Sequence, residues 1–129
     1  MRQRNAKPKT LIFFLADSLS QPFGEKKFEM VVALNVLELI EPLKLLKIIG
    51  TQIQRFVILS DPYDYERGNK SVKNRVDEKT LRTKLIQMGF KLIHETKKPS
   101  FVPWKLQVNP RLELNYKVDI IVGERNSDL

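Results

Sequence analysis

The stretch FEMVVALNVLE, residues 28–38, decides the fold of this chain. Residues 28–34 are apolar at almost every position and rich in valine, which is typical of a β-strand buried inside a parallel sheet. Asn35 interrupts the apolar run. Glu41 and Pro42 then start a helix, because proline is tolerated in the first helical turn and an acid there favours the positive end of the helix dipole. The stretch therefore predicts the strand and helix of an α/β sheet.

Further elements are expected on both sides of this stretch. The apolar run at 10–16 predicts a second strand buried on both faces, and the long charged segment 61–76 predicts a loop. Asp77 is a suitable N-cap for a helix through Met88, which Gly89 closes. The complete expected set is strands at 10–16, 28–34, 56–60, 90–95 and 116–124, helices from Pro42 and from Asp77, and a proline-containing connection between the last two strands.

Length and composition limit the domain organisation. A chain of 129 residues with 42% hydrophobic residues has room for one domain with a core. We expect a flexible basic tail at 1–9, an α/β domain at 10–125 and a short tail at 126–129. The absence of cysteine excludes disulfides, thiolate metal ligands and a cysteine nucleophile. Apolar runs fall far short of the roughly 20 residues of a membrane span, so a soluble cytoplasmic protein is expected.

The charge of the chain raises nucleic acid as a partner without favouring it. The formal net charge is +8, but four basic residues lie in the first ten positions with no acid among them. A solvated basic surface is the favoured interpretation, and a nucleic-acid site remains the alternative. The densest basic run comprises Lys70, Lys73, Arg75, Lys79, Arg82 and Lys84. No Gly-x-Ser-x-Gly elbow, P-loop or zinc-ligand spacing occurs.

Several motifs occur in the order and spacing of a known family. They are ADSLSQPF at 16–23, FEMVVALNVLE at 28–38, FVILSDPY at 56–63, the helix ending in Gly89-Phe90, and the last strand at 116–124. Together they resemble the C-terminal portion of the class I S-adenosylmethionine-dependent methyltransferases, type 11-like. The resemblance implies an incomplete Rossmann-like sheet, mostly parallel with an antiparallel C-terminal strand and helices on its faces.

The resemblance also implies a set of cofactor-binding residues. Asp17 would accept a hydrogen bond from the adenine amino group, with Leu19 beside the purine and Ser18 between them in the same segment. Asn35 would face the cofactor or the substrate, and Val36 would supply an apolar wall. Asp17 is equally suited to end a strand before a turn, and asparagine is also favoured where a strand gives way to a helix.

Other residues leave two interpretations open. Asp61 and Tyr63 would line a substrate site in a complete enzyme, although their surroundings are also typical of a solvated loop. His94 lacks neighbouring ligands at metal spacing, which disfavours a metal or general-base role. Trp104 and Phe101 either stack on a base or substrate or cover the edge of the sheet.

The departures from the family bear most directly on function. The five glycines, at 24, 50, 68, 89 and 123, include no Gly-x-Gly, and no ribose-binding acid after a second strand is found. S-adenosylmethionine binding by this chain alone is therefore expected to be weak or absent, as in a truncated or split enzyme. In the family, two further strands lie between those matching 10–16 and 28–34, so a homodimer or a partner chain supplying them is expected. The alternatives are a non-catalytic dimerisation or interaction module and a basic nucleic-acid-binding protein.

Overall fold

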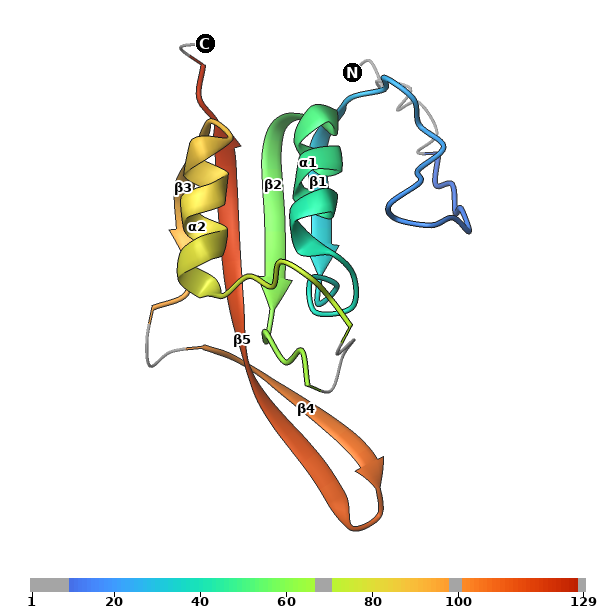
Figure 1. Ribbon diagram of the computed structural model, residues 1–129, viewed down its shortest axis with the longest axis vertical. Coiled ribbons are helices and arrows are strands. Elements are labelled where there is room, and N and C mark those ends of the chain that lie inside the picture. Colours follow the sequence, from blue (N-terminus) through green and yellow to red (C-terminus); the bar gives the residue numbers. More distant parts are fainter. Residues whose placement is uncertain (1–9, 67–70, 98–100, 128–129) are drawn as a thin grey trace, which may run out of the picture.

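A computed structural model describes residues 10–66, 71–97 and 101–127 of the chain. Within these ranges two helices and five strands follow one another in the order β1-α1-β2-α2-β3-β4-β5 (Figure 1). Their bounds are β1 Phe28–Leu34, α1 Pro42–Gln52, β2 Ile53–Asp61, α2 Glu78–Gln87, β3 Phe90–Glu95, β4 Val102–Asn109 and β5 Leu112–Arg125. The expected strands after residue 27 and both expected helices are present.

The strands form one sheet in the order β1-β2-β5-β3, and β4 extends β5 as a hairpin. β1 is parallel to β2, whereas β5 is antiparallel to both β2 and β3. β1, β2 and β3 therefore run in one direction, and β5 lies between β2 and β3 in the opposite direction. This topology confirms the predicted α/β class and the antiparallel C-terminal strand.

Local signals explain both helices. Asp77 accepts a hydrogen bond from the backbone N–H of Thr80 at 2.7 Å, so it caps α2 as predicted. Gly89, with φ of +90°, ends the same helix in a conformation that glycine adopts readily. α1 begins at Pro42 and directs its apolar side chains inward at helical spacing.

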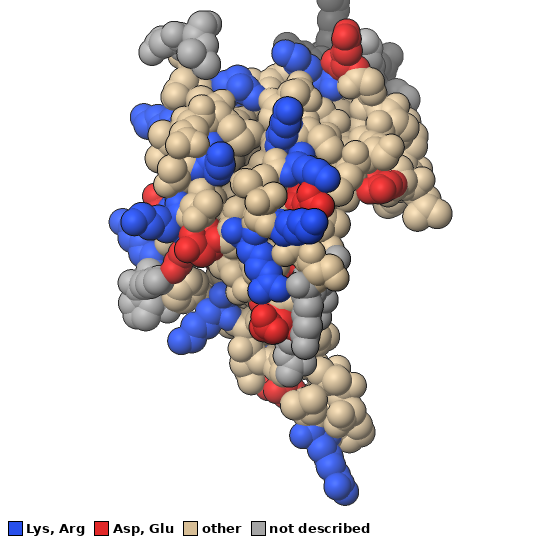
Figure 2. All heavy atoms as spheres, in the orientation of Figure 1, with Lys and Arg blue, Asp and Glu red and all other residues tan. Residues whose placement is uncertain are grey.

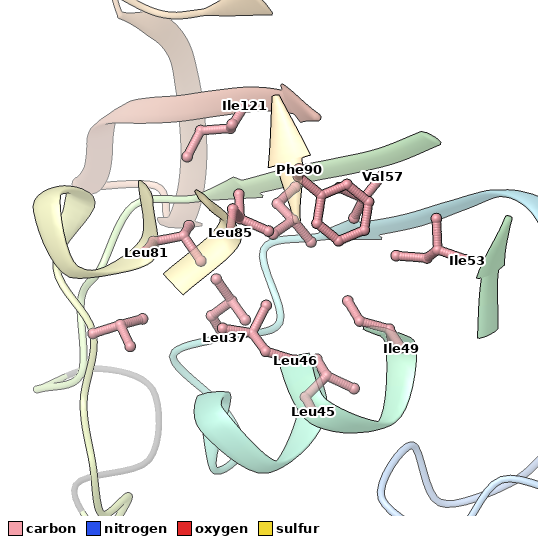
Figure 3. Packing of buried hydrophobic residues seen from close by; sticks show 12 residues of the cluster. Leu37, Leu45, Leu46, Ile49, Ile53, Val57, Leu81, Leu85, Phe90 and Ile121 are labelled. Carbon is pink, nitrogen blue, oxygen red and sulfur yellow. The ribbon is translucent and has the colours of Figure 1, made fainter. Parts of the chain in front are cut away.

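Both helices pack on the same face of the sheet (Figure 1). Residues paired across strands share a face, and Leu59 of β2 pairs with Ala33 of β1 and Ile121 of β5. These positions face the helices and join the core (Figure 3). The fully enclosed part of that core includes Leu37, Leu46, Val57, Leu59, Leu81, Leu85, Phe90 and Ile121. We call this side of the sheet the covered face.

The alternating side chains form the opposite side, which we call the bare face. Its apolar residues are Met30, Val32 and Leu34 of β1, Phe56 and Ile58 of β2, and Ile120 and Val122 of β5, and Ser60 and Glu124 lie on the same side. None of the helices described packs on this side (Figure 1). The three β1 side chains remain 47%, 50% and 54% exposed. An apolar sheet face without a covering layer is unusual in an α/β domain, where both faces are normally covered.

The strand expected at 10–16 does not form, and this prediction is wrong. Residues 10–17 have no regular secondary structure, and Leu11, Phe13 and Leu15 are 78%, 86% and 105% exposed. A strand needs a neighbour to satisfy its backbone N–H and C=O groups. Only one edge of β1 is paired, with β2, and residues 10–17 do not pair with its open edge.

The connection expected between the last two strands contains a strand that sequence reasoning missed. β4 pairs with the first half of β5, which begins at Leu112 rather than Tyr116, and the two project from the body as a hairpin (Figure 1). The prolines of this segment predict a connection without regular structure. Pro110 lies in the two-residue turn, and Pro103 lies in a strand paired on one side only, where proline is tolerated.

Candidate functional site

The carboxyl ends of β1 and β2 lie side by side and are followed by two loops, 35–41 and 62–66. Ligands of open α/β sheets bind at this end of the strands. Asn35 follows β1, with φ of +54°, and its backbone N–H donates to the carbonyl of Ser60 at 2.7 Å. The hydroxyl of Ser60 donates to Asn35 Oδ1 at 3.1 Å. Asn35 is therefore fixed against the neighbouring strand in a backbone conformation that asparagine tolerates.

Asp61 is the last residue of β2, and its carboxylate connects the two loops. Its Oδ1 accepts from the backbone N–H of Leu37 at 3.1 Å, and its Oδ2 accepts from that of Tyr63 at 2.9 Å. The residue is fully buried, and burial raises the pKa of its carboxyl to about 6 against the opposing effect of these hydrogen bonds. These contacts give Asp61 a clear part in positioning the loops, and its role as a substrate ligand stays a prediction.

Tyr63 turns back toward the sheet. Its φ of +57° is uncommon for an aromatic residue, and such backbone conformations occur preferentially at functional sites. Its hydroxyl donates to Asp119 Oδ2 at 2.7 Å. Burial first, and then this hydrogen bond to a carboxylate, raise the pKa of the Tyr63 hydroxyl. Tyr63 is thus held in its neutral, hydrogen-donating form.

Asp119 is the centre of a buried polar network that the sequence did not reveal. Arg82 of α2 donates to both of its carboxylate oxygens at 2.8 Å, and Thr96 donates to Oδ1. Arg82 also donates to Glu95 at 2.8 Å. Burial alone would raise the pKa of Asp119, but the hydrogen bonds from Arg82, Thr96 and Tyr63 lower it overall. Nothing in the local sequence around Arg82 indicated this network.

Two further acids complete the loop region. Glu38, which is buried, accepts from the backbone N–H of Asp64 at 2.8 Å, and Asp64 Oδ2 accepts from the hydroxyl of Tyr116 at 2.9 Å. Burial raises the pKa of Glu38, and the nearby Asp61 and Asp64 raise it further. The loop after β1, the loop after β2 and the hairpin are therefore connected through Glu38 and Asp64.

The predicted adenine-binding segment lies beside β1 rather than among these loops. Asp17 Oδ1 accepts from the backbone N–H of Leu19 at 2.8 Å and so closes its own turn. Leu19 packs against the core. A groove of about 500 Å³ runs along β1 and is lined by Ser18 and Val36, together with Phe14, Phe23 and the β1 residues. The structure thus brings Ser18 and Val36 to one groove, whereas Asn35, Asp61 and Tyr63 belong to the loop region.

The remaining sequence candidates are placed as follows. Trp104 stacks on Tyr116 within the hairpin, with ring centroids 5.1 Å apart, instead of covering the main sheet. His94 lies in β3, and nowhere in the described ranges do three His, Asp or Glu side chains gather as metal ligands. Arg82 of the basic run is used within the fold, and Lys70 lies outside the described residues. On the face in view, Lys and Arg are interspersed with acidic and uncharged residues (Figure 2).

Comparison with known proteins identifies the fold. No family model matches the chain, and no curated protein matches it. Among solved structures it is similar to magnesium protoporphyrin IX methyltransferase (ChlM) from Synechocystis PCC 6803, crystallised with bound SAH, with a TM-score of 0.54 over 86% of this chain. Sequence identity is 15%, and the chain spans 49% of that protein, about half its length. The chain has part of a methyltransferase fold.

No helix in the described part of the chain is both long and apolar enough to cross a membrane.

Proposed function

We propose that this chain is the acceptor-side part of an S-adenosylmethionine-dependent methyltransferase-like protein. On this proposal, the part of the fold that grips the cofactor comes from a segment outside these 129 residues. The isolated chain then binds the cofactor weakly or not at all. Support comes from the partial methyltransferase fold and from the loops at the carboxyl ends of β1 and β2, which the fold holds rigidly.

The observation that carries this proposal is that, among the described residues, the sheet lacks both a strand beside β1 and a helix on the bare face. The outer edge of β1 has no paired strand among the described residues, and the adjoining bare face has no helix. Exposure on that face is greatest at the edge strand, where Met30, Val32 and Leu34 are about half exposed. An open apolar edge favours aggregation unless another strand covers it. A single additional strand with its helix would cover both the open edge of β1 and the bare face.

The geometry favours a β-strand with its helix over a second copy of the chain. Two copies paired through β1 would extend the sheet and leave both bare faces exposed. Two copies packed through the bare face would leave both edges open. A strand added beside β1 and connected to a helix covers both at once, because the crossover of a parallel unit places its helix on the sheet face.

The described residues fit only part of the cofactor. The groove along β1 has an apolar wall that includes Val36, which suits a purine ring. Asp17 is engaged by its own turn, and no Gly-x-Gly turn exists in the sequence to approach the methionine end. When bound, the cofactor would supply an activated methyl group. This chain would supply the purine wall and orient the acceptor through the loops that Asp61 and Glu38 position.

Isothermal titration calorimetry with S-adenosylhomocysteine tests this proposal. We expect no binding by the isolated chain in the micromolar range, which corresponds to about 8 kcal/mol and exceeds what one purine wall supplies. Val36→Asp is the matched variant: any weak binding should vanish in it, whereas Ile86→Asp, at an exposed position of α2 outside the groove, should retain it. Micromolar binding by the unmodified chain alone would contradict the proposal.

A non-catalytic interaction module is the second candidate function. The exposed apolar run that includes Leu11, Phe13 and Leu15 favours it, together with the bare face. The two candidates separate once a complementary segment is found. An assembled complex that binds S-adenosylhomocysteine supports the methyltransferase-like function, and an assembled complex that does not bind it supports the interaction module.

A further inference from the structure

The projecting hairpin has one apolar face and one polar face. Directly opposed residues of antiparallel strands share a face. The couples on one face are Val102 with Val118, Trp104 with Tyr116, and Leu106 with Leu114. The couples on the other face are Pro103 with Lys117, Lys105 with Asn115, and Gln107 with Glu113. The six couples separate apolar from polar residues except at Pro103, which lies on the polar face.

The apolar face is partly uncovered. Val102 and Leu106 are 40% and 41% exposed, whereas Val118 is buried. A two-stranded hairpin has no core of its own and is stable only with further packing. Figure 2 shows uncharged residues over much of the hairpin, with basic side chains at its tip. The face is therefore suited to an apolar occupant.

This face begins where the candidate site ends. Tyr116, in the centre of the apolar face, donates its hydroxyl to Asp64 of the loop after β2 at 2.9 Å. Val118 is followed directly by Asp119, whose Oδ2 accepts a hydrogen bond from the Tyr63 hydroxyl at 2.7 Å. The hairpin leaves the body at the carboxyl ends of β1 and β2, where α/β sheets bind ligands (Figure 1). The apolar face and the loop region are thus continuous.

The dimensions and charge of the hairpin disfavour a second copy as the occupant. Two strands of eight residues cover roughly 27 Å by 10 Å, about 300 Å², whereas a standard protein interface buries about 800 Å² on each partner. The formal net charge of +8 on each chain also disfavours close association of two copies. A small molecule matches the size of the surface better.

We propose that the apolar face of the hairpin binds the methyl acceptor and that this acceptor is an apolar aromatic small molecule. The word acceptor rests on the proposed function, whereas the binding of an aromatic molecule does not. The rings of Trp104 and Tyr116 are stacked on each other with an interplanar angle of 25°, and the outer face of this pair is the platform that we propose for a further ring. A planar ring stacks favourably on such a platform. The hydrogen bond from Tyr116 to Asp64 fixes the platform against the loops of the candidate site.

The single tryptophan of the chain makes this proposal directly measurable. The indole N–H of Trp104 gives one NMR signal, which can be followed while 2-naphthol is added, with cyclohexanol as the non-aromatic control. We expect a saturable shift of this signal with 2-naphthol and no comparable shift with cyclohexanol. Leu106→Ser, on the apolar face, should weaken binding about tenfold. Gln107→Ser, the neighbouring position on the polar face, should leave binding unchanged.

Other outcomes would overturn the proposal. The Trp104 signal would stay unchanged up to millimolar 2-naphthol if the platform did not bind aromatic molecules. A response to protein concentration alone would identify a second copy as the occupant, and a response to phosphatidylglycerol vesicles alone would identify a lipid surface. The measurement needs no cofactor, so naphthol binding in a chain whose assembled form never binds S-adenosylhomocysteine would refute the methyltransferase function while leaving the aromatic site intact.

Discussion

The two faces of the sheet are built from the same strands and differ only in what covers them. On the covered face, alternate residues of β1, β2 and β5 meet α1 and α2, and Val57 and Leu59 are fully buried. On the bare face, the residues between them are apolar as well, yet Met30, Val32 and Leu34 remain about half exposed. An apolar pattern on both faces indicates that both evolved to be covered. The difference shows which side of the sheet lacks a covering layer among the described residues.

The largest effect is expected at the polar contact that ties α2 to the covered face. Arg82→Met would leave Asp119, whose side chain is 1% exposed, as a buried and unpaired carboxylate. Breaking a buried ion pair in this way costs about 3–5 kcal/mol of unfolding free energy. Urea denaturation measures it, and Lys79→Met on the same helix is the control with little expected change. A loss below about 1 kcal/mol would mean that the network is not formed as described.

A leucine on each face gives a direct comparison. Leu59→Ala removes a fully buried side chain from the covered face and should cost about 2–5 kcal/mol. Leu34→Ala removes one that is 54% exposed on the bare face and should cost less than about 1 kcal/mol. Denaturation of both variants in parallel checks the contrast. Equal losses would show that the bare face is covered in solution.

The pH dependence of stability should report the burial of Asp61. Its pKa rises from 3.8 to about 6 on folding, so the folded state favours the protonated form. The stabilisation from this group is complete below about pH 4 and is lost as the pH rises through 6, by up to about 3 kcal/mol. Asp61→Asn should lower stability by removing one amide contact and should also flatten this part of the pH profile. An unchanged profile in the variant would argue against the raised pKa.

Two tyrosines should differ in how much the hydrogen bonds of their hydroxyl groups contribute to the free energy of unfolding. Tyr65, which is 7% exposed, both donates to and accepts from the backbone of Val76, so Tyr65→Phe should cost about 1–3 kcal/mol. Tyr116→Phe removes the hydroxyl hydrogen bond to Asp64 and should cost about 1 kcal/mol or less. Thermal unfolding of the pair tests the order. A larger loss of stability in Tyr116→Phe than in Tyr65→Phe would contradict this prediction.

Sequence reasoning succeeded where the determining interactions are local. The β1 strand, the Pro42 start of α1 and the Asp77 cap of α2 each depend on residues within a few positions of one another. The resemblance to the family, rather than a local signal, pointed to Asn35 and Asp61, and the structure places them at the adjacent carboxyl ends of β1 and β2. The fold class followed from the order of these elements.

The failures have one physical origin, which is the dependence on distant neighbours. The run at 10–16 has the composition of a strand but pairs with no other strand, and β4 forms, despite Pro103, because β5 lies opposite it. The contact between Arg82 and Asp119 joins residues 37 positions apart. No local pattern distinguishes such an arginine from a solvated one.

Sedimentation velocity of the isolated chain, combined with binding of an apolar fluorescent dye, tests the central claim most directly. The account predicts a chain that self-associates or binds the dye, and a Val32→Lys variant with reduced dye binding, because Val32 lies at the centre of the exposed β1 residues of the bare face and is 50% exposed. Val57→Lys is not a suitable control, since it would unfold the core; Lys91→Ala, at the rim of the sheet, should leave dye binding unchanged. A stable monomer that binds no dye would contradict the claim that this sheet awaits a covering strand and helix.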